Sequence, residues 1–147
     1  MKAAVYYSPR DTRTKEVAVP EIGDHEVLVE MKACGICGSD LMHWYLKPRA
    51  PLVLGHEPAG IIAKKGKKVE EVNLGDRVFV HHHVACMTCH YCLNGDYTLC
   101  DQFHKTNIKP GGFAEFFKVP FPNLQLDTLK IPESMSFAEA TLIKPVG

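Results

Sequence analysis

Four closely spaced cysteines are the residues of this sequence with the clearest chemical potential. They are Cys86, Cys89, Cys92 and Cys100. The first three are separated by gaps of two residues, which let a tight turn direct successive sulfurs at one centre about 2.3 Å away, as in a tetrahedral structural zinc site. Turn-forming Asn94-Gly95-Asp96 precedes the fourth cysteine, so the backbone can fold back without a hydrophobic core of its own. We predict a structural zinc lobe over about residues 84–103.

Two other uses of these cysteines compete with zinc. Bacterial iron–sulfur proteins also use two short gaps, but their fourth cysteine comes four residues later and precedes proline. Here the last gap is longer and Asp101 follows. A disulfide framework would require secretion, and Met1–Val5 begins no apolar run with a signal-peptide cleavage site. The spacing favours zinc in a soluble, cytoplasmic protein, where thiols stay reduced.

A second group of reactive side chains lies upstream. Cys34-Gly-Ile-Cys37-Gly-Ser39-Asp40 leads into a candidate helix, and a thiol ahead of a helix amino terminus favours its thiolate form. A redox pair of Cys34 and Cys37 would need a βαβ setting that this strand-rich region does not suggest. Further on, His56-Glu57 supplies two metal-capable side chains between glycines. A solvated turn is the alternative for this pair.

Short strands must position these groups. Period-two or β-branched patterns predict strands over 2–7, 14–19, 26–33, 77–80 and 113–119. In the third of these, the expected inward-facing residues are Val27, Val29, Met31 and Ala33. A short helix is expected over 41–46, capped by Ser39 or Asp40. Another should begin at Ser136, which forms a capping-box pattern with Glu139. The class is mostly β: a partly open barrel with short helices.

Composition limits the partners of the chain. Its 147 residues fit one domain, and 17 basic residues balance 17 acidic ones. No charge excess attracts nucleic acid or anionic lipid. No stretch approaches the roughly 18 apolar residues of a membrane span. We therefore expect neither a nucleic-acid partner nor a membrane partner.

Two further histidine features are weaker signals. His81-His82-His83 ends a predicted strand, and consecutive residues on a strand alternate faces, so the three cannot all reach one metal. We expect a surface role for them. His43 lies on the predicted short helix and is a candidate for proton relay, although a histidine there is more often packed or solvated.

The combined motifs resemble a known family. Gly55-His56-Glu57, Gly60, Gly66 and Val69 fall at the spacing of the zinc-containing alcohol dehydrogenase signature. The upstream Cys37 segment and the four-cysteine lobe agree with it. Over its whole length the chain resembles the catalytic GroES-like domain of medium-chain alcohol dehydrogenases, in particular the sorbitol and threonine dehydrogenase branch. The resemblance implies a GroES-like partly open barrel over residues 1–147. It also implies that a Rossmann NAD(P)-binding domain follows, since this chain has no Gly-x-Gly-x-x-Gly.

The resemblance also implies roles for individual residues. Cys37, His56 and Glu57 would hold a catalytic zinc, which lowers the pKa of a bound substrate hydroxyl. Asp40 would orient the histidine ligand, and Ser39 would pass the proton outward. His43 would be a further relay. Hydride would leave the alcohol carbon of a small-molecule substrate for NAD or NADP, in a complete enzyme that is a homo-oligomer; this chain alone would be inactive.

One residue departs from the family pattern. Members of this branch carry a glutamate ligand to the catalytic zinc where this chain has Lys144. An ammonium has no lone pair for a metal, and it repels a dication. Either the other ligands still bind zinc, or Lys144 occupies the site as a substitute cation. The second alternative leads to a different function, that of a zinc-stabilised domain without dehydrogenase activity of its own.

Overall fold

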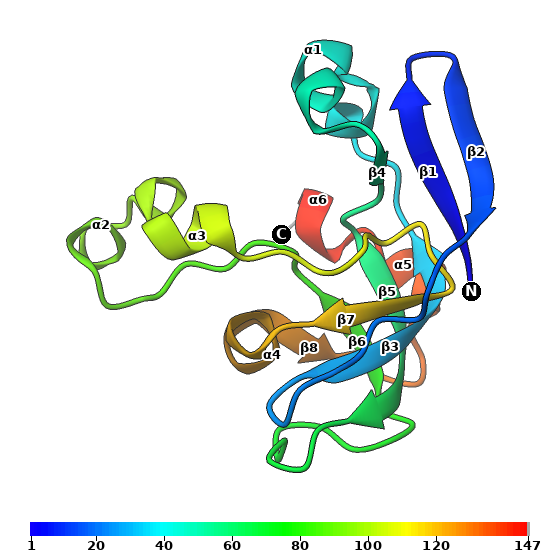
Figure 1. Cartoon of the computed structure of the whole chain (residues 1–147). Helices are drawn as coiled ribbons and strands as arrows, with labels where there is room; N and C mark the ends of the chain where they lie inside the picture. The colour runs from blue at the N-terminus through cyan, green and yellow to red at the C-terminus, as the bar shows by residue number, and fades with distance from the viewer. Residues whose placement is uncertain (147) are drawn as a thin grey trace.

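The computed structural model describes residues 1–146 and contains two antiparallel sheets (Figure 1). The first has the order β2-β1-β4, from β1 (Lys2–Ser8), β2 (Asp11–Glu16) and β4 (Leu52–Val53). The second has the order β7-β3-β5-β6-β8, from β3 (Val27–Cys34), β5 (Pro58–Lys65), β6 (Arg77–Val80), β7 (Phe116–Val119) and β8 (Thr128–Lys130). The mostly β prediction is confirmed, and both sheets stay open instead of closing into a barrel.

The first hairpin differs from the predicted one. The second strand was expected over 14–19, but β2 spans Asp11–Glu16. The register explains the difference, because Ser8 pairs with Asp11 across a turn of only two residues. This tight turn moves the whole second strand towards the amino terminus.

Strand β3 lies at the centre of the core. It pairs with β5 on one side and β7 on the other. Val27 and Val29 are fully buried, as predicted, together with Phe117 of β7. Met31 and Ala33, also expected inside, are only partly buried, because this end of the strand leads out of the core. The strand predicted over 113–119 is shorter, with β7 beginning at Phe116.

The helices are all short. Three of them lie between β3 and β4: a 3₁₀ turn η1 (Gly38–Leu41), α1 (His43–Leu46) and a second 3₁₀ turn η2 (Lys47–Arg49). The single helix predicted over 41–46 is interrupted at Met42, whose ψ of 87° is not helical. The first turn begins one residue after Cys37, and Asp40 accepts a hydrogen bond from the Cys37 amide at 3.0 Å. The predicted cap at Ser39 or Asp40 is therefore replaced by one at Cys37.

The carboxyl-terminal segment folds back against the second sheet. It contains α5 (Phe137–Ala140) and α6 (Ile143–Val146), and the predicted capping box is confirmed, since Ser136 Oγ accepts from the Glu139 amide at 3.1 Å. Arg77 of β6 fixes this segment by donating to the carbonyls of Pro132 and Met135, at 2.8 and 2.6 Å. Its guanidinium also stacks on a phenylalanine ring of α5. Helix α6 is thereby held beside the start of β5.

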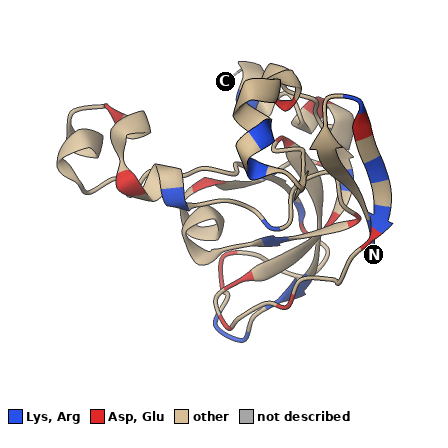
Figure 2. Cartoon of the chain, turned by 45° about the horizontal axis from the view of Figure 1, so that its top comes forward, with Lys and Arg blue, Asp and Glu red and all other residues tan. Residues whose placement is uncertain are grey.

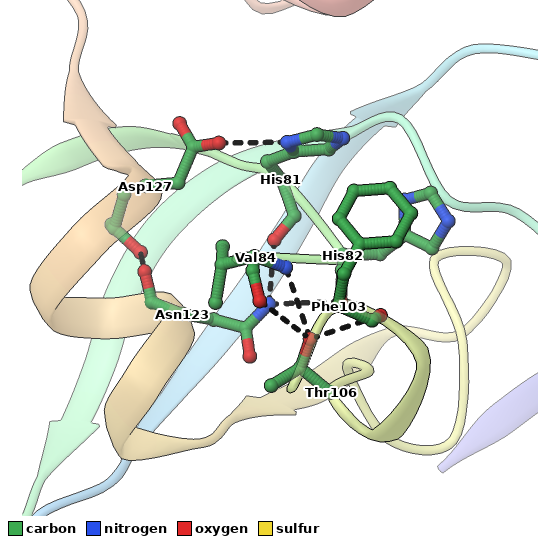
Figure 3. Close-up of polar contacts among 8 residues, drawn as sticks. His81, His82, Val84, Phe103, Thr106, Asn123 and Asp127 are labelled. Atoms are coloured by element: carbon green, nitrogen blue, oxygen red, sulfur yellow. Dashed lines mark hydrogen bonds and ion pairs between the residues drawn. The ribbon is translucent and has the colours of Figure 1, made fainter. Parts of the chain in front are cut away.

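The cysteine lobe extends from the body of the molecule (Figure 1). It contains α2 (His90–Leu93), the 3₁₀ turn η3 (Tyr97–Leu99) and α3 (Asp101–Lys105). Thr106 joins it to the body, because its hydroxyl accepts from the Val84 amide at 2.9 Å and donates to the Gln102 carbonyl at 3.1 Å. Helix α4 (Phe121–Asp127) supports the same region through Asn123, which donates to two histidine carbonyls at 2.8 Å (Figure 3).

Acidic and basic residues are interspersed over the chain, in keeping with its balanced composition (Figure 2). Within residues 1–146, no helix has the length and apolar character needed to cross a bilayer.

Candidate metal centres

The lobe brings its four cysteine sulfurs to one place. All four lie within 4.8 Å of one another. In a tetrahedral site with zinc–sulfur bonds of about 2.3 Å, neighbouring sulfurs are about 3.8 Å apart. Cys86 and Cys92 sulfurs are 3.9 Å apart, and those of Cys89 and Cys92 are 3.5 Å apart. The arrangement fits a tetrahedral metal, and all six cysteines of the chain are free thiols, unlike those of a disulfide framework.

Backbone amides in the lobe are directed at these sulfurs. The Cys89 amide donates to the sulfur of Cys86 at 3.3 Å, and the Cys86 amide donates to that of Cys100 at 3.4 Å. Hydrogen bonds from Thr88 and Cys89 lower the pKa of Cys86 below the ordinary value of a thiol, whereas burial raises the pKa of Cys92. Such donors stabilise anionic sulfur, which is the form that binds a metal. Met87 adopts a left-handed conformation, with φ of 61°, in the turn that aligns the first two thiols.

A second cluster joins the loop after β3 to the start of β5. The sulfur of Cys37, a ring nitrogen of His56 and a carboxylate oxygen of Glu57 lie within 4.8 Å of one another. Gly55 makes this possible, because its φ is +85° and a Cβ there would lie 2.8 Å from the Phe113 ring. The predicted ligand set therefore converges, although its members come from two segments.

Asp40 fixes the orientation of the histidine. Its Oδ1 lies 3.4 Å from His56 Nδ1 and accepts from the Gly55 amide, while Oδ2 accepts from the Cys37 amide. The other ring nitrogen, Nε2, lies 3.2 Å from the hydroxyl of Ser39. Burial opposes the protonation of His56, but hydrogen bonds to Asp40 and Cys37 outweigh it and raise its pKa. The imidazole thus directs Nε2 towards the side where a metal or a substrate would bind.

Lys144 reaches the same cluster from α6. Its Nζ lies 3.8 Å from Glu57 Oε1, and the Glu57 side chain is 5% exposed. The ammonium therefore faces one of the three candidate ligands. This is the position that the alternative of a substitute cation requires.

His43 is placed differently from the other predicted site residues. It is the first residue of α1, and its side chain is exposed. It does not line the cavity beside His56. The geometry therefore gives no support to a relay role for His43.

The histidine run is not a surface feature, contrary to expectation. All three residues are half-buried. His81 Nδ1 lies 2.7 Å from a carboxylate oxygen of Asp127, and His83 Nδ1 lies 2.6 Å from the Thr106 carbonyl oxygen. His82 packs between its neighbours, with its ring centroid 5.5 Å from that of His81, 4.0 Å from that of His83 and 4.7 Å from that of His56. Burial is the main cause that lowers the pKa of His82 to about 2, so this ring is neutral.

Strand pairing explains this placement, and the sequence indicated only that the run ends a strand. The run directly follows β6, which pairs antiparallel with β5, and His56 lies two residues before β5. Antiparallel pairing puts the end of one strand beside the start of the other. A cavity of about 410 Å³ opens beside these rings.

Comparison with known proteins agrees with this geometry. The sequence profile described as "Alcohol dehydrogenase GroES-like domain" matches residues 23–133. The chain belongs to this family. The resemblance predicted from the signature residues is confirmed, and so is the GroES-like fold class.

Several relatives of the GroES-like domain have named activities. This chain is 41% identical to a sorbitol dehydrogenase of Bacillus subtilis (strain 168), over 99% of this chain and 42% of the relative. It is 39% identical to an alcohol dehydrogenase of Geobacillus stearothermophilus, over 100% of this chain and 44% of the relative. The crystal structure of galactitol-1-phosphate dehydrogenase from Escherichia coli superimposes with a TM-score of 0.79 and 33% identity, over 99% of this chain and 42% of that one. The chain thus spans less than half the length of these relatives.

Proposed function

We propose that this chain is the substrate-binding and metal-binding part of a zinc- and NAD(P)-dependent alcohol or polyol dehydrogenase. The observation that carries the proposal is the convergence of Cys37, His56 and Glu57 beside a cavity, with Asp40 and Ser39 arranged around the histidine. The complete enzyme would oxidise a primary or secondary alcohol by hydride transfer to nicotinamide. Relatives named as sorbitol and alcohol dehydrogenases support this substrate class.

The residues of the cluster have distinct tasks in this proposal. Cys37, His56 and Glu57 would hold the catalytic zinc, which when bound acts as a Lewis acid towards the substrate hydroxyl. Asp40 keeps His56 in one orientation, so that Nε2 faces the cavity. Ser39 lies within hydrogen-bonding distance of that nitrogen and would relay the hydroxyl proton, taking it up as its own hydroxyl proton passes outward to solvent. Asp40 and Glu57 are buried, and exclusion of water around them would strengthen these interactions.

The cysteine lobe has a structural task. Cys86, Cys89, Cys92 and Cys100 would hold a second zinc, which replaces a hydrophobic core in a segment that lies outside the main body. Closed ligation by four thiols leaves no position for a substrate. Free thiols throughout the chain are consistent with a cytoplasmic protein.

A nicotinamide site must come from elsewhere. Dinucleotides bind at a Gly-rich turn between a strand and a helix of a parallel sheet, whereas both sheets in residues 1–146 are antiparallel. The curated relatives are more than twice as long as this chain. We infer that a longer parent protein provides a Rossmann domain and assembles as a homo-oligomer, and that residues 1–147 alone are inactive.

A second function is favoured by one contact. The ion pair between Lys144 and Glu57 satisfies a candidate ligand without a metal. A GroES-like domain with this pair intact would keep the lobe zinc and lack catalysis of its own. The two functions make different predictions for the full-length protein.

The decisive assay is the reduction of NAD or NADP by the full-length protein with a panel of alcohols and polyols. We expect the parent protein to reduce the nucleotide. The reaction should be lost in Cys37→Ala and slowed in Ser39→Ala. Ser8→Ala, in an exposed strand end, is the control and should behave like the parent. Full-length protein that folds, carries zinc and reduces neither nucleotide with any alcohol would support the non-catalytic alternative.

A further inference from the structure

The cavity beside His56 has a wall with a clear excess of positive charge. Its lining residues include three permanent cations, Arg49, Lys105 and Lys144, but a single carboxylate, Asp40. The chain as a whole is neutral, with 17 basic and 17 acidic residues. The excess at the cavity is therefore local. Because the three cations come from η2, α3 and α6, the fold brings them together from distant parts of the sequence.

The single carboxylate of the wall does not balance these cations. The Asp40 side chain is only 5% exposed, and its oxygens accept from the amides of Cys37 and Gly55 and lie beside His56. The negative charge of Asp40 thus interacts with these two amides and with His56. Such a carboxylate offers little to a ligand in the cavity and does not neutralise the far wall.

Arg49 is the cation best prepared for a ligand. Its guanidinium stacks on the Tyr45 ring, 4.0 Å from the centroid, and one nitrogen donates to the Tyr45 carbonyl. These two contacts hold the planar group in place while its other donors stay available. A guanidinium held in this way suits bidentate binding of a phosphate or a carboxylate.

Lys105 and Lys144 add to the positive electrostatic potential of the cavity. Lys105 pairs with Asp101 at 3.6 Å, but both side chains are largely exposed, so the pair neutralises little. Asp101 does not line this cavity. Lys144 pairs with Glu57 at 3.8 Å, at the end of the cavity where the candidate metal ligands lie. The cavity volume of about 410 Å³ is in the usual range for a small-molecule site.

We propose that the substrate of this site is a polyol that carries an anionic group, either a phosphate monoester or a carboxylate. Arg49 and Lys105 bind the anion, while the hydroxyl to be oxidised lies near His56 and Ser39. The proposal rests on the proposed dehydrogenase function and narrows its substrate class. A neutral polyol would leave the excess positive charge of this wall uncompensated, above all the guanidinium of Arg49, whereas Lys105 has only an exposed partner and Lys144 pairs with Glu57.

The test compares three probes on the full-length enzyme at constant ionic strength: sorbitol, sorbitol 6-phosphate and gluconate. We expect kcat/KM for one anionic probe to exceed that for sorbitol by about tenfold or more, as one charge-assisted hydrogen-bonded contact provides. The preferred anion distinguishes phosphate from carboxylate. Arg49→Gln should reduce kcat/KM for that probe about tenfold more than for sorbitol, mainly through KM. Lys47→Gln, also exposed in η2 but outside the cavity, is the matched control and should leave both values unchanged.

Binding of inorganic phosphate and of the same probes to this chain, measured by calorimetry, gives a readout that needs no turnover. The anion site is supported if at least one anion binds and if Arg49→Gln, but not Lys47→Gln, weakens that binding. This holds even if no alcohol is oxidised, and in that case only the proposed dehydrogenase function fails. Efficient oxidation of sorbitol, with equal effects of Arg49→Gln on neutral and anionic probes, would overturn the inference and leave the dehydrogenase function standing. Absence of both anion binding and anionic turnover would also overturn it.

Discussion

Replacement of Lys144 by glutamate tests how the candidate catalytic site handles a metal. The ammonium lies 3.8 Å from Glu57 Oε1. A metal bound to that carboxylate at about 2 Å would lie roughly 5 Å from the ammonium nitrogen. At that separation a single and a double positive charge repel by about 2–7 kcal/mol for effective dielectric constants between about 80 and about 20.

The lower end of this range applies to Lys144. Its side chain is 24% exposed and sits on the short last helix, so it can turn towards water when a metal binds. About 2 kcal/mol corresponds to roughly a 30-fold change in dissociation constant. Lys144→Gln, which removes the charge and adds no anionic ligand, should show this gain alone. Lys144→Glu should bind zinc more tightly still, because it adds a carboxylate to the cluster.

The assay is the zinc content of each purified variant by mass spectrometry, with affinity measured by competition against a chromophoric chelator. In the parent chain we expect one tightly bound zinc in the lobe and a second, at Cys37, His56 and Glu57, that is held roughly 30-fold more weakly because of Lys144. Lys144→Glu should hold both zinc ions tightly, and Lys144→Gln should be intermediate in affinity for the second. Lys67→Glu, in an exposed turn, provides the control for a change of the same charge elsewhere. Two tight zinc ions in the parent chain, with no change in Lys144→Glu, would refute the argument.

Three further predictions concern stability. Cys92→Ser should destabilise the chain by several kcal/mol, because metal binding contributes folding energy in the lobe, whereas Cys37→Ser should cost less than about 1 kcal/mol; equal losses in chemical denaturation would contradict this division. Gly55→Ala should cost about 1–3 kcal/mol, since its φ of +85° is strained for alanine and the new Cβ meets an aromatic ring at 2.8 Å; an unchanged melting temperature would argue against the local geometry. The third is a pH effect at Glu26. Burial raises its pKa, but the Gly23 amide and the Lys118 ammonium, 3.0 Å away, outweigh burial and lower the pKa below its ordinary value of 4.5. A lowered folded-state pKa stabilises the fold above the unfolded value and loses that contribution as pH falls through the folded value. The stability difference between the parent chain and Glu26→Gln should therefore shrink between pH 6 and about pH 3, and a difference that stays constant over this interval would show that the ionised carboxylate does not matter.

Features encoded within a short stretch could be predicted from the sequence. The four lobe cysteines lie close together along the chain, so a local turn suffices to gather their sulfurs. The capping box at Ser136 is equally local. The pair His56-Glu57 and the upstream Cys37 segment were recognisable from their metal-capable side chains and from the spacing of the family signature. The structure adds the steric reason for Gly55, namely its positive φ.

Other features depend on how distant segments pack. His82 approaches His56 only because β5 and β6 pair antiparallel, and the side-chain alternation of an isolated strand indicated a surface position instead. Lys144 reaches Glu57 because the carboxyl-terminal segment is fixed against the sheet by Arg77. The sequence showed that Lys144 departs from the family pattern, but it did not show that the Lys144 ammonium pairs with Glu57.

The charge of the cavity beside His56 shows most clearly what the sequence determines and what tertiary packing determines. Composition determined that the chain is neutral overall, and it could not indicate where charges gather. Arg49, Lys105 and Lys144 lie on three short helices, far apart in sequence, and no local periodicity relates them. Tertiary packing decides that they line one cavity, because electrostatic potential depends on distances in space and not on separation along the chain.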